Sequence, residues 1–445
     1  MTHGVEEVPL TLEGRPPRTL GVLDQGALWA NLGVSLLGFS GALVLLDPLG
    51  NAPLSLAAAL VATVVGSLIG TAMVGLSAVP GTRTGQPAMV LLRGLFGARI
   101  SYVPTVLNIV QMLGWGAFEL WVIAKGATAI FGSVPYQVWV IVAGVLTTAL
   151  TIWPLGSIRL LRRYVTVGVI VSMIWFTVFF LREAPVHQGG DWTAFPAAVD
   201  YVIALSVSWV PMAADFARHS RSGRAAFTGV VGGYTLAQVA CLGLGVYAVA
   251  IAGAAGVSAD PTSVFGPFVA VPLGALFFGI LVLRETDQSF ANVYSTTVSL
   301  QNLMPRMDRR VFSAVIGVLT VVIALFVDVN SYGSFLSVIG AVFVPMFAVL
   351  AIEYFVLGGA GRWNTAQDAP SRWAMLVPWA LGFVAYWLTT STPTVPAWDG
   401  LWAGLREAIG FARQPWMNGA LGGALVAALV TLVIGLLTRR SAARR

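Results

Sequence analysis

A short run of charged and polar residues interrupts a long apolar stretch of this sequence. The run reads Arg-Glu-Thr-Asp-Gln at 284–288, and Asn292 follows it five residues after the aspartate. Apolar residues precede the run at 269–283, and an apolar segment resumes at 293–300. Charges at the depth of a bilayer are costly and usually face the protein interior or a water-filled cavity. The run therefore predicts a functional site inside a membrane protein.

A second set of polar residues lies on one face of another apolar segment. Gln111, Trp115 and Glu119 are spaced i, i+4 and i+8, so a helix would place all three along one stripe. An amide, an indole and a carboxylate on one stripe would suit a flat polar ligand. The alternative is that Glu119 pairs with a cation of another helix, for which Arg284 is the obvious candidate; both interpretations can hold together.

The run at 284–288 could also bind a cation. Thr286 and Asp287 would supply hard oxygen ligands, and backbone carbonyls of an opened helix would complete a site for Na+. The carboxylate could instead hold a proton, because burial disfavours its charged form. Asn292 offers both a donor and an acceptor to the edge of a heterocycle, although a hydrogen bond between helices would explain it as well.

Composition identifies the class of protein that must position these residues. The chain has 445 residues, of which 57% are hydrophobic and 10% charged. A spanning helix needs about 20 predominantly apolar residues. The first 25 residues are polar and contain proline, so we predict no cleaved signal peptide. Twelve segments qualify as spans: 26–46, 53–79, 102–131, 136–156, 163–181, 198–216, 226–252, 268–300, 311–328, 332–357, 373–391 and 418–438.

The basic residues predict the orientation in the membrane. The net charge is +6, and the cations are arginines except for Lys125. Most arginines lie at the termini or in alternate gaps between the predicted spans, while the other gaps hold only Arg182, Arg406 and Arg413. This positive-inside pattern predicts that both termini are cytoplasmic in the cell (inner or plasma) membrane. It also explains the basic charge without a nucleic-acid partner.

Several function classes are excluded by what the sequence lacks. Cys241 is the only cysteine, so there is no internal disulfide and no cysteine-based metal site. The three histidines are scattered, and no phosphate-binding loop is present, so ATP-driven transport is not expected. No nucleophile–base pair suggests an enzyme, and no cofactor is predicted.

Helix breakers indicate where the backbone opens. The first span contains Ala-Asn-Leu-Gly-Val-Ser-Leu-Leu-Gly at 30–38, and the sixth contains Ser-Val-Ser-Trp-Val-Pro at 206–211. These positions correspond if the first ten spans form two inverted halves of five. Broken helices at corresponding positions indicate the midplane site of a transporter. The alternative is that Gly and Pro are simply common in membrane helices. Near the second break, Asp215 and Arg218 are expected to pair locally, and Trp209 either packs or forms a wall of the site.

Taken together, these segments resemble the nucleobase:cation symporter-1 family, the purine/cytosine permeases. The resemblance covers about residues 20–360, and only the combination of motifs is specific. The matching stretches are Phe-Leu-Ser-Val-Ile-Gly-Ala-Val-Phe-Val-Pro at 335–345, Ile-Glu-Tyr-Phe at 352–355, Gly-Trp at 114–115, Trp209, Asp215 with Arg218, Ala-Asn-Val-Tyr-Ser at 291–295 and Gly-Leu-Phe-Gly at 94–97.

The resemblance implies an all-α integral membrane protein with 12 transmembrane helices. Helices 1–5 at 26–182 and helices 6–10 at 198–357 would form a five-plus-five inverted-repeat core. Two additional C-terminal helices would occupy 373–438. The tails at 1–25 and 439–445 would be cytoplasmic.

The resemblance also assigns roles to the candidate substrate residues. Trp115 and Trp209 would sandwich a planar base, and Asn292 would recognise its edge. Glu119 stands where the family often has glutamine. Gln111 and Ser208 complete the predicted substrate set.

For the coupling cation, the resemblance implies backbone carbonyls near Gly33 and Leu36, the carbonyl of Leu283, and the side chains of Thr286 and Asp287. The family often has serine or threonine at the position of Asp287, so the carboxylate leaves the choice between Na+ and H+ open. Arg284 and Glu285 match no feature of the family pattern.

The sequence thus predicts a secondary active importer of a nucleobase or related amino-substituted heterocycle, coupled to Na+ or H+. A carboxylate at 119 favours an amino-imine edge, as in cytosine, adenine or an aminopyrimidine vitamin precursor, over the oxo-only edge of uracil. The alternatives are a transporter of the same fold for an amino acid or a hydantoin- or allantoin-like solute, and a non-transporting membrane sensor. The expected partners are the substrate and the lipid bilayer; the oligomeric state is not determined, and a monomer is compatible.

Overall fold

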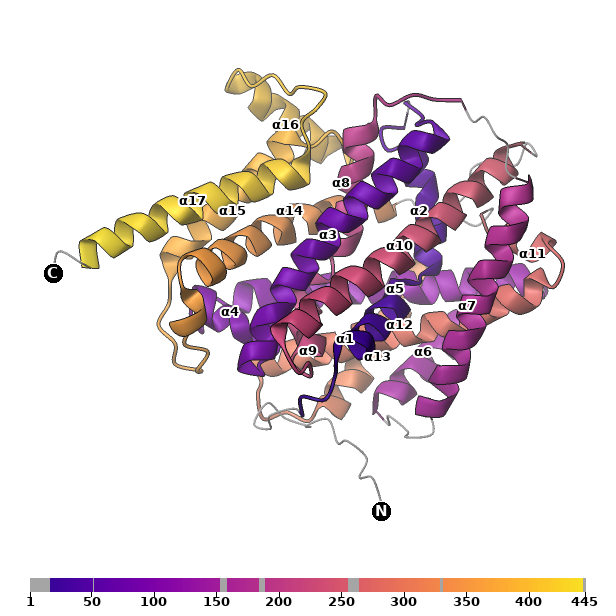
Figure 1. Cartoon of the computed structure of the whole chain (residues 1–445), viewed down its shortest axis with the longest axis horizontal. Helices are drawn as coiled ribbons and strands as arrows, with labels where there is room; N and C mark the ends of the chain where they lie inside the picture. The colour runs from indigo at the N-terminus through magenta and orange to yellow at the C-terminus, as the bar shows by residue number, and fades with distance from the viewer. Residues whose placement is uncertain are drawn as a thin grey trace, which may run out of the picture.

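The structure, a computed structural model, describes residues 17–50, 52–152, 158–183, 189–254, 264–328 and 331–442. Within these ranges the chain is helical (Figure 1). Its β-structure there consists of two isolated bridges, which join Leu20 to Ser220 and Leu54 to Asp191. The predicted all-α class is therefore confirmed.

The helices vary widely in length: α10 has 32 residues, and α5 and α12 have 30 residues each. The α-helices are α1 (Val22–Gly33), α2 (Leu36–Leu46), α3 (Leu56–Thr84), α4 (Ala88–Phe96), α5 (Tyr102–Phe131), α6 (Tyr136–Ile152), α7 (Ile158–Glu183), α8 (Phe195–Val207), α9 (Ala213–Ala217), α10 (Gly223–Ala254), α11 (Phe265–Ala270), α12 (Gly274–Leu303), α13 (Arg309–Phe326), α14 (Tyr332–Ala351), α15 (Leu376–Thr389), α16 (Pro396–Ala408) and α17 (Gly419–Ala442). Short turns of other helical types are η1 (Val210–Met212), the π-helical η3 (Ile352–Val356), η4 (Gly359–Gly361) and η5 (Trp373–Met375).

Each of the twelve predicted spans coincides with a helix or a broken helix. Among the described residues, seven helices are long and apolar enough to cross a membrane, or eight if the bent pair α1 and α2 is one span. Three shorter apolar helices lie at Tyr136–Ile152, Arg310–Phe326 and Trp373–Thr389. The long helix α12 carries the charged run, which lowers its hydropathy. The number of helices that cross the membrane and the inverted-repeat layout remain predictions.

Both predicted helix breaks are present. Helix α1 ends at Gly33 and α2 begins at Leu36, with a bend of 62° between them. Val34 and Ser35 are extended at the break, and the Ser35 hydroxyl caps α2 by accepting from Leu37 N. In the sixth span, α8 gives way to η1 and then to α9. Pro211 lacks an N–H and cannot continue a regular α-helix.

Small residues let the helices around the second break approach closely. Gly66 and Gly70 of α3 face α8, and a Cβ at Gly70 would lie 2.6 Å from the Cβ of Ser206. Two small residues four positions apart are common at contacts between membrane helices. The hydrophobic effect does not drive helices together in lipid, so close backbone packing has to stabilise the contact. This packing holds the end of α8 firmly against α3.

A buried aspartate joins α8 to the C-terminal helices. The Asp200 carboxylate accepts from Ala420 N at 2.7 Å and from Gly419 N at 3.0 Å, at the N-terminus of α17. A carboxylate is favoured there because the unpaired amides and the helix dipole are positive. Figure 1 shows α14, α15 and α17 side by side, with α17 outermost.

Two helices lie in segments that the sequence assigned to gaps. All nine residues of α4 are buried, and α16 follows α15 outside the main bundle. Helix α4 is too short to be recognised as a span. The first residue of α4 is held by Asp215, whose carboxylate accepts a hydrogen bond from Ala88 N at 2.8 Å. Arg218 donates a hydrogen bond to the Tyr294 hydroxyl at 3.0 Å. Asp215 and Arg218 therefore each have a further hydrogen-bond partner, while they remain close enough to interact electrostatically as expected.

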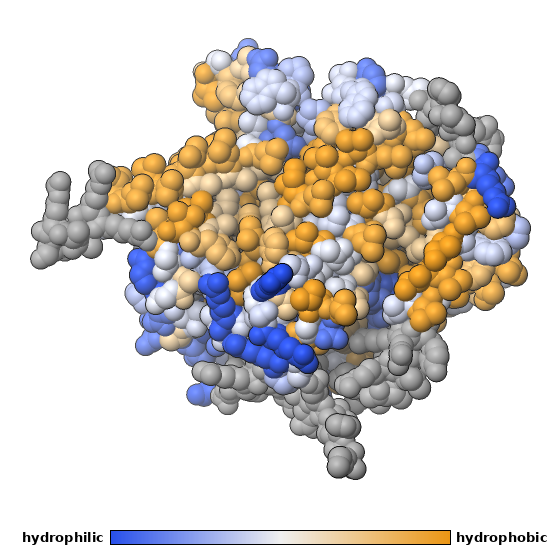
Figure 2. All heavy atoms as spheres, viewed as in Figure 1, coloured by the Kyte–Doolittle hydropathy of each residue, from blue (hydrophilic) through white to orange (hydrophobic). Residues whose placement is uncertain are grey.

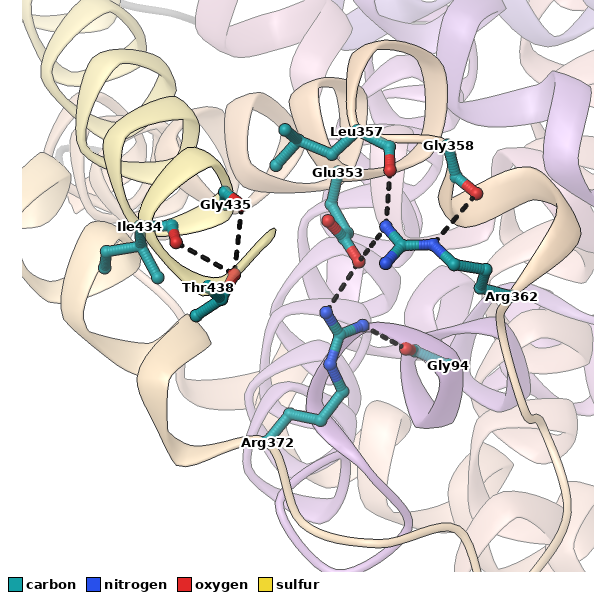
Figure 3. Close-up of polar contacts among 9 residues, drawn as sticks. All are labelled: Gly94, Glu353, Leu357, Gly358, Arg362, Arg372, Ile434, Gly435 and Thr438. Atoms are coloured by element: carbon teal, nitrogen blue, oxygen red, sulfur yellow. Dashed lines mark hydrogen bonds and ion pairs between the residues drawn. The ribbon is translucent and has the colours of Figure 1, made fainter. Parts of the chain in front are cut away.

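Figure 2 shows a broad band of hydrophobic residues across α17, α3 and α10, with hydrophilic residues gathered below it. A charged cluster also joins the end of α14 to α4 (Figure 3). There the Glu353 carboxylate contacts Arg372 at 2.6 Å and Arg362 at 3.8 Å, and Arg372 donates to the Gly94 carbonyl at 2.8 Å. This cluster attaches the segment after η3 to the buried short helix.

Candidate functional site

A cavity lies beside the α1–α2 break, between α5, α8, α10 and α12. Its free interior is narrow, about 40 Å³. Its wall combines aromatic, apolar and a few polar residues: Gly33, Ser35, Leu37, Gly38, Met112, Trp115, Glu119, Leu205, Ser208, Trp209, Met212, Tyr234, Gln238, Cys241, Leu242, Gln288, Asn292 and Tyr332. The structure thus brings Trp115, Glu119, Ser208, Trp209 and Asn292 of the predicted substrate set together, along with Gly33.

Other aromatic rings pack against both indoles. Trp115 packs edge-on against Tyr332, with ring centroids 5.9 Å apart, and against Phe335 at 5.6 Å. Trp209 packs edge-on against Trp29 at 5.7 Å and against Tyr234 at 6.1 Å. Edge-to-face contacts of this kind add to the burial energy of the rings and restrict their rotation. The two indoles are therefore pre-positioned in the wall of one cavity.

Glu119 is the carboxylic acid in this wall. Its side chain is fully buried, and its carboxyl group lies within hydrogen-bonding reach of the Glu285 carboxyl group, while no N–H or hydroxyl donor of the described residues contacts it. The indole N–H of Trp115 lacks a partner among the same residues. Buried polar groups are nearly always hydrogen-bonded, so these atoms suggest that something else satisfies them. Donors of a ligand would suit the carboxyl oxygens.

Gln111 does not line the cavity, unlike the rest of the predicted stripe. Its amide nitrogen donates to Asn108 Oδ1 and to the Ser208 carbonyl, both at 3.0 Å. The Ser208 carbonyl lies at the end of α8, where the helix opens and carbonyls lose their intrahelical partners. Gln111 therefore braces the break from behind. The Ser208 hydroxyl donates to the Leu205 carbonyl at 2.7 Å.

An arginine–glutamate pair from α12 faces the α1–α2 break. The Glu285 carboxylate accepts from the Ser35 hydroxyl at 2.9 Å and from Leu36 N at 3.2 Å, at the first residues of α2. Arg284 lies 3.6 Å from Glu285 and donates to Asn31 Oδ1 at 3.3 Å, in the last turn of α1. Both charged side chains are fully buried. The structure therefore gives Arg284 the neighbouring Glu285 as its ion-pair partner, rather than Glu119.

The predicted cation ligands of α12 lie elsewhere on that helix. The Leu283 side chain is 50% exposed, and its carbonyl accepts from the Thr286 hydroxyl at 2.7 Å. Neither Thr286 nor Asp287 belongs to the cavity wall. A helix turns by roughly 100° per residue, so with Glu285 at the break its next two neighbours face other directions. The structure thus places Glu285 where we expected Thr286 and Asp287, and it brings Leu36 N, rather than its carbonyl, to that carboxylate.

Sequence reasoning missed Gln238 and Tyr234, which α10 contributes to the wall. Gln238 accepts from the Ser206 hydroxyl at 2.9 Å and donates to the Val202 carbonyl at 3.3 Å, so it ties α10 to α8. A glutamine inside the otherwise apolar segment 226–252 was a usable signal. Tyr234 and Tyr332 carried no such signal, because tyrosine is common in membrane helices.

The described residues contain no group of three or more histidine, cysteine, aspartate or glutamate side chains that could hold a metal ion. An alkali cation bound by carbonyls and hydroxyls is a separate case, and the α1–α2 break is the place where its ligands would have to meet.

Comparison with known proteins places this architecture among transporters. A family model described as permease for cytosine/purines, uracil, thiamine, allantoin matches residues 48–367. Among curated proteins, none matches the chain.

Three solved structures have the same overall fold. Mhp1, a nucleobase-cation-symport-1 family transporter in a closed conformation with bromovinylhydantoin bound, has a TM-score of 0.73 at 16% identity, over 96% of this chain and 94% of that chain. The inward-facing conformation of Mhp1 also has a TM-score of 0.73 at 16% identity, over 98% of this chain and 96% of that chain. A Na+-coupled sialic acid symporter in a substrate-bound outward-open state has a TM-score of 0.63 at 11% identity, over 94% of this chain and 90% of that chain.

Proposed function

From the premise that this chain belongs to the family of permeases for cytosine/purines, uracil, thiamine and allantoin, we propose that it is a secondary active importer of a nucleobase or related amino-substituted heterocycle. Transport is coupled to a cation, Na+ or H+. The protein lies in the cell membrane with both termini cytoplasmic. Its core is a five-plus-five inverted repeat with two additional helices.

The observation that carries this proposal is the convergence of two indoles, a carboxyl group and an amide on one cavity. Trp115 and Trp209 offer two flat apolar surfaces to a planar ring. Glu119 and Asn292 offer hydrogen bonds to its edge. Apolar walls with a few placed polar groups are typical of small-molecule sites. A flat heterocycle with polar edges matches this combination better than a flexible amino acid does.

Glu119 narrows the substrate class. Its carboxyl group in the cavity wall suits an amino-imine edge, such as that of cytosine, adenine or an aminopyrimidine. An oxo-only edge would leave buried polar groups unpaired. Sites that hydrogen-bond a substrate in this way can reject the wrong partner by about 10⁴–10⁵-fold. Hydantoin- and allantoin-like solutes are the second candidate substrate class. Mhp1, which has a similar fold, has bromovinylhydantoin bound in its closed conformation.

The two broken helices supply the moving parts of the mechanism. In alternating access, cation binding orders the opened helices, the ring enters between the indoles, and the site then opens to the other side. One elementary charge moving inward across 100 mV supplies about 2.3 kcal/mol. That energy sustains roughly 50-fold accumulation. One coupling cation per substrate therefore supplies enough free energy to concentrate a scarce substrate inside the cell.

A thermal-shift screen followed by uptake tests the proposal. Cytosine and adenine are expected to stabilise the purified protein, and cytosine is expected to compete for uptake far better than uracil. Equal competition by uracil and cytosine would refute the assigned substrate edge. If all nucleobases and hydantoins fail to stabilise the protein while an amino acid succeeds, the alternative solute class replaces this one.

Variants test the assigned site. Trp115→Ala and Asn292→Ala are expected to abolish uptake while the protein still reaches the membrane. Trp192→Ala is the matched control, because Trp192 is an exposed tryptophan outside the cavity. Retained uptake in both site variants would dismiss the site. Binding without counterflow in proteoliposomes would instead indicate a sensor.

A further inference from the structure

The α1–α2 break brings together two helix ends of opposite partial charge. The last carbonyls of α1 are electronegative, and the first amides of α2 are electropositive. In transporters with discontinuous helices, such ends often bind coupling cations and anionic substrate groups. Here the chain itself supplies both charges: Glu285 contacts the start of α2, and Arg284 contacts Asn31 in the last turn of α1.

We propose that Arg284 is a resident cation that takes the place of a transported Na+ at this break, and that the coupling ion is a proton carried by Glu119. This inference rests on the transport function proposed above, and it chooses between the two coupling ions left open there.

The groups at the break do not suit Na+. An arginine guanidinium stays charged under physiological conditions, so its positive charge is permanent. It already uses the side-chain oxygens of Asn31, Glu285 and Gln288, the last at 3.1 Å. On α12, the Thr286 hydroxyl and the Leu283 carbonyl are hydrogen-bonded to each other at 2.7 Å, and none of Leu283, Thr286 and Asp287 lines the cavity. A second cation would therefore find a positive charge and few free oxygens.

Glu119 is the group left without a counter-ion. Its charged neighbours on α12 are Arg284 and Glu285, and the Glu285 carboxyl lies within hydrogen-bonding reach of the Glu119 carboxyl, so the two groups hold a proton more readily than two negative charges. The phenols of Tyr234 on α10 and Tyr332 on α14 also face Glu119. Arg284 is paired with Glu285, so an ionised Glu119 would leave one uncompensated negative charge in a buried site. Uncompensated charge at bilayer depth is costly. A proton on Glu119 removes that cost, and water can exchange the proton when the cavity opens.

The same proton explains how the substrate is coupled to it. An amino-imine edge has a basic ring nitrogen beside an amino group. The amino N–H donates to one oxygen of Glu119, and the proton lies between the other oxygen and the ring nitrogen. Two hydrogen bonds form whichever side holds the proton. One proton and one base therefore enter and leave as a unit, while uracil lacks a basic nitrogen to share it.

Transport by the full chain in proteoliposomes tests the inference, with radiolabelled cytosine as the probe. An acid-outside gradient without Na+ is expected to drive accumulation, about tenfold for one pH unit. An inward Na+ gradient at equal pH is expected to have no effect. Na+-driven accumulation at equal pH would overturn the inference. Equilibrium counterflow without any gradient is the separate check on transport itself: its absence would overturn the proposed function, and this inference with it.

A second readout needs no transport. Na+ is expected to leave the Tm of the wild-type protein unchanged relative to choline, and a saturable rise would overturn the inference. Arg284→Ala is expected to have a lower Tm that millimolar guanidinium raises. Arg372→Ala is the matched control, because Arg372 also pairs with a glutamate but lies partly exposed and away from the break. If guanidinium raises neither Tm or both equally, Arg284 is not a replaceable cation.

Proton stoichiometry tests Glu119 directly. Calorimetric titration of cytosine over a series of pH values, in buffers of different ionisation enthalpy, is expected to show proton uptake that rises with pH to about one per bound base, because only a site that has lost the Glu119 proton must regain it on binding. In Glu119→Gln, binding is expected to be weaker and to take up no proton. Undiminished proton uptake by the variant, or none by the wild type, would show that Glu119 is not the carrier. Where Arg284→Ala does not fold, the wild-type titrations still decide the question.

Discussion

Two arginine–glutamate clusters of this protein have the same chemistry and very different surroundings. In the cluster joining α14 to α4, Glu353 and Arg372 approach to 2.6 Å, yet the Arg372 side chain is 34% exposed and that of Arg362 is 56% exposed. At the α1–α2 break, Arg284 and Glu285 are 3.6 Å apart and fully buried. The longer contact is the more consequential one.

Solvent explains this difference. An exposed ion pair contributes about 0–1 kcal/mol, because water screens it and side-chain order opposes it. Breaking a buried pair costs about 3–5 kcal/mol, because the remaining partner is left uncompensated. The partners differ as well: Glu353 and Arg372 hold a connecting segment to Gly94, whereas Glu285 contacts the opened end of α2. Distance alone therefore does not identify the pair whose loss is expected to cost more.

The largest expected effect comes from removing the buried cation. Arg284→Ala is expected to abolish uptake and to lower the free energy of unfolding by about 3–5 kcal/mol, because Glu285 is left charged and unpaired. Chemical unfolding in detergent and uptake in vesicles measure the two effects. A loss no greater than that of Arg372→Ala would contradict the contrast between the clusters.

Replacing both charges separates folding from function. In Arg284→Met/Glu285→Met the stability is expected to recover to within about 2 kcal/mol of the wild type, because two apolar side chains leave no uncompensated charge. Uptake is expected to stay absent, since the ends of α1 and α2 have lost their counter-charges. Recovery of transport along with stability would show that the pair acts only in folding.

A histidine next to Arg218 gives a pH effect that must be distinguished from proton coupling. Burial, together with the positive Arg218, lowers the pKa of His219 to about 4. In the unfolded chain this pKa is about 6.5, so the unfolded state binds the extra proton first and stability falls as pH drops from about 6.5 towards 4. His219→Gln is expected to weaken this acid destabilisation in pH-dependent unfolding. Acid-driven uptake should persist in the variant; its loss would move the proton carrier away from Glu119.

The smallest expected effect is in the exposed cluster. Arg372→Ala is expected to cost less unfolding free energy than Arg284→Ala and to retain uptake, because Arg372 is partly exposed and Arg362 stays beside the buried Glu353 carboxylate. Arg362→Ala, whose contact with Glu353 is 3.8 Å, is expected to cost less still. Unfolding midpoints and initial uptake rates of the two variants provide the measurement. Loss of transport in Arg372→Ala would give the segment between η3 and α15 a role in the transport cycle.

Sequence alone determined the class of protein and the position of its helices. Apolar segments long enough to span a bilayer are visible without a structure, and so are the glycine and proline that open the first and sixth segments. Spacing within one helix was equally secure: Trp115 and Glu119 were predicted on one stripe of α5, and both line the cavity. The angle between two side chains around the axis of one helix follows from helical periodicity alone.

Only the tertiary structure decided how each helix is rotated about its own axis. Polar residues 284–288 cover every face of α12, so their spacing could not reveal that Glu285, rather than Asp287, meets the break. Gln111 lies on the predicted stripe, yet it does not line the cavity, and its amide nitrogen donates to the Ser208 carbonyl at the end of α8. Periodicity fixes angles between residues of one helix, whereas the absolute rotation of that helix depends on contacts with residues far away in the sequence.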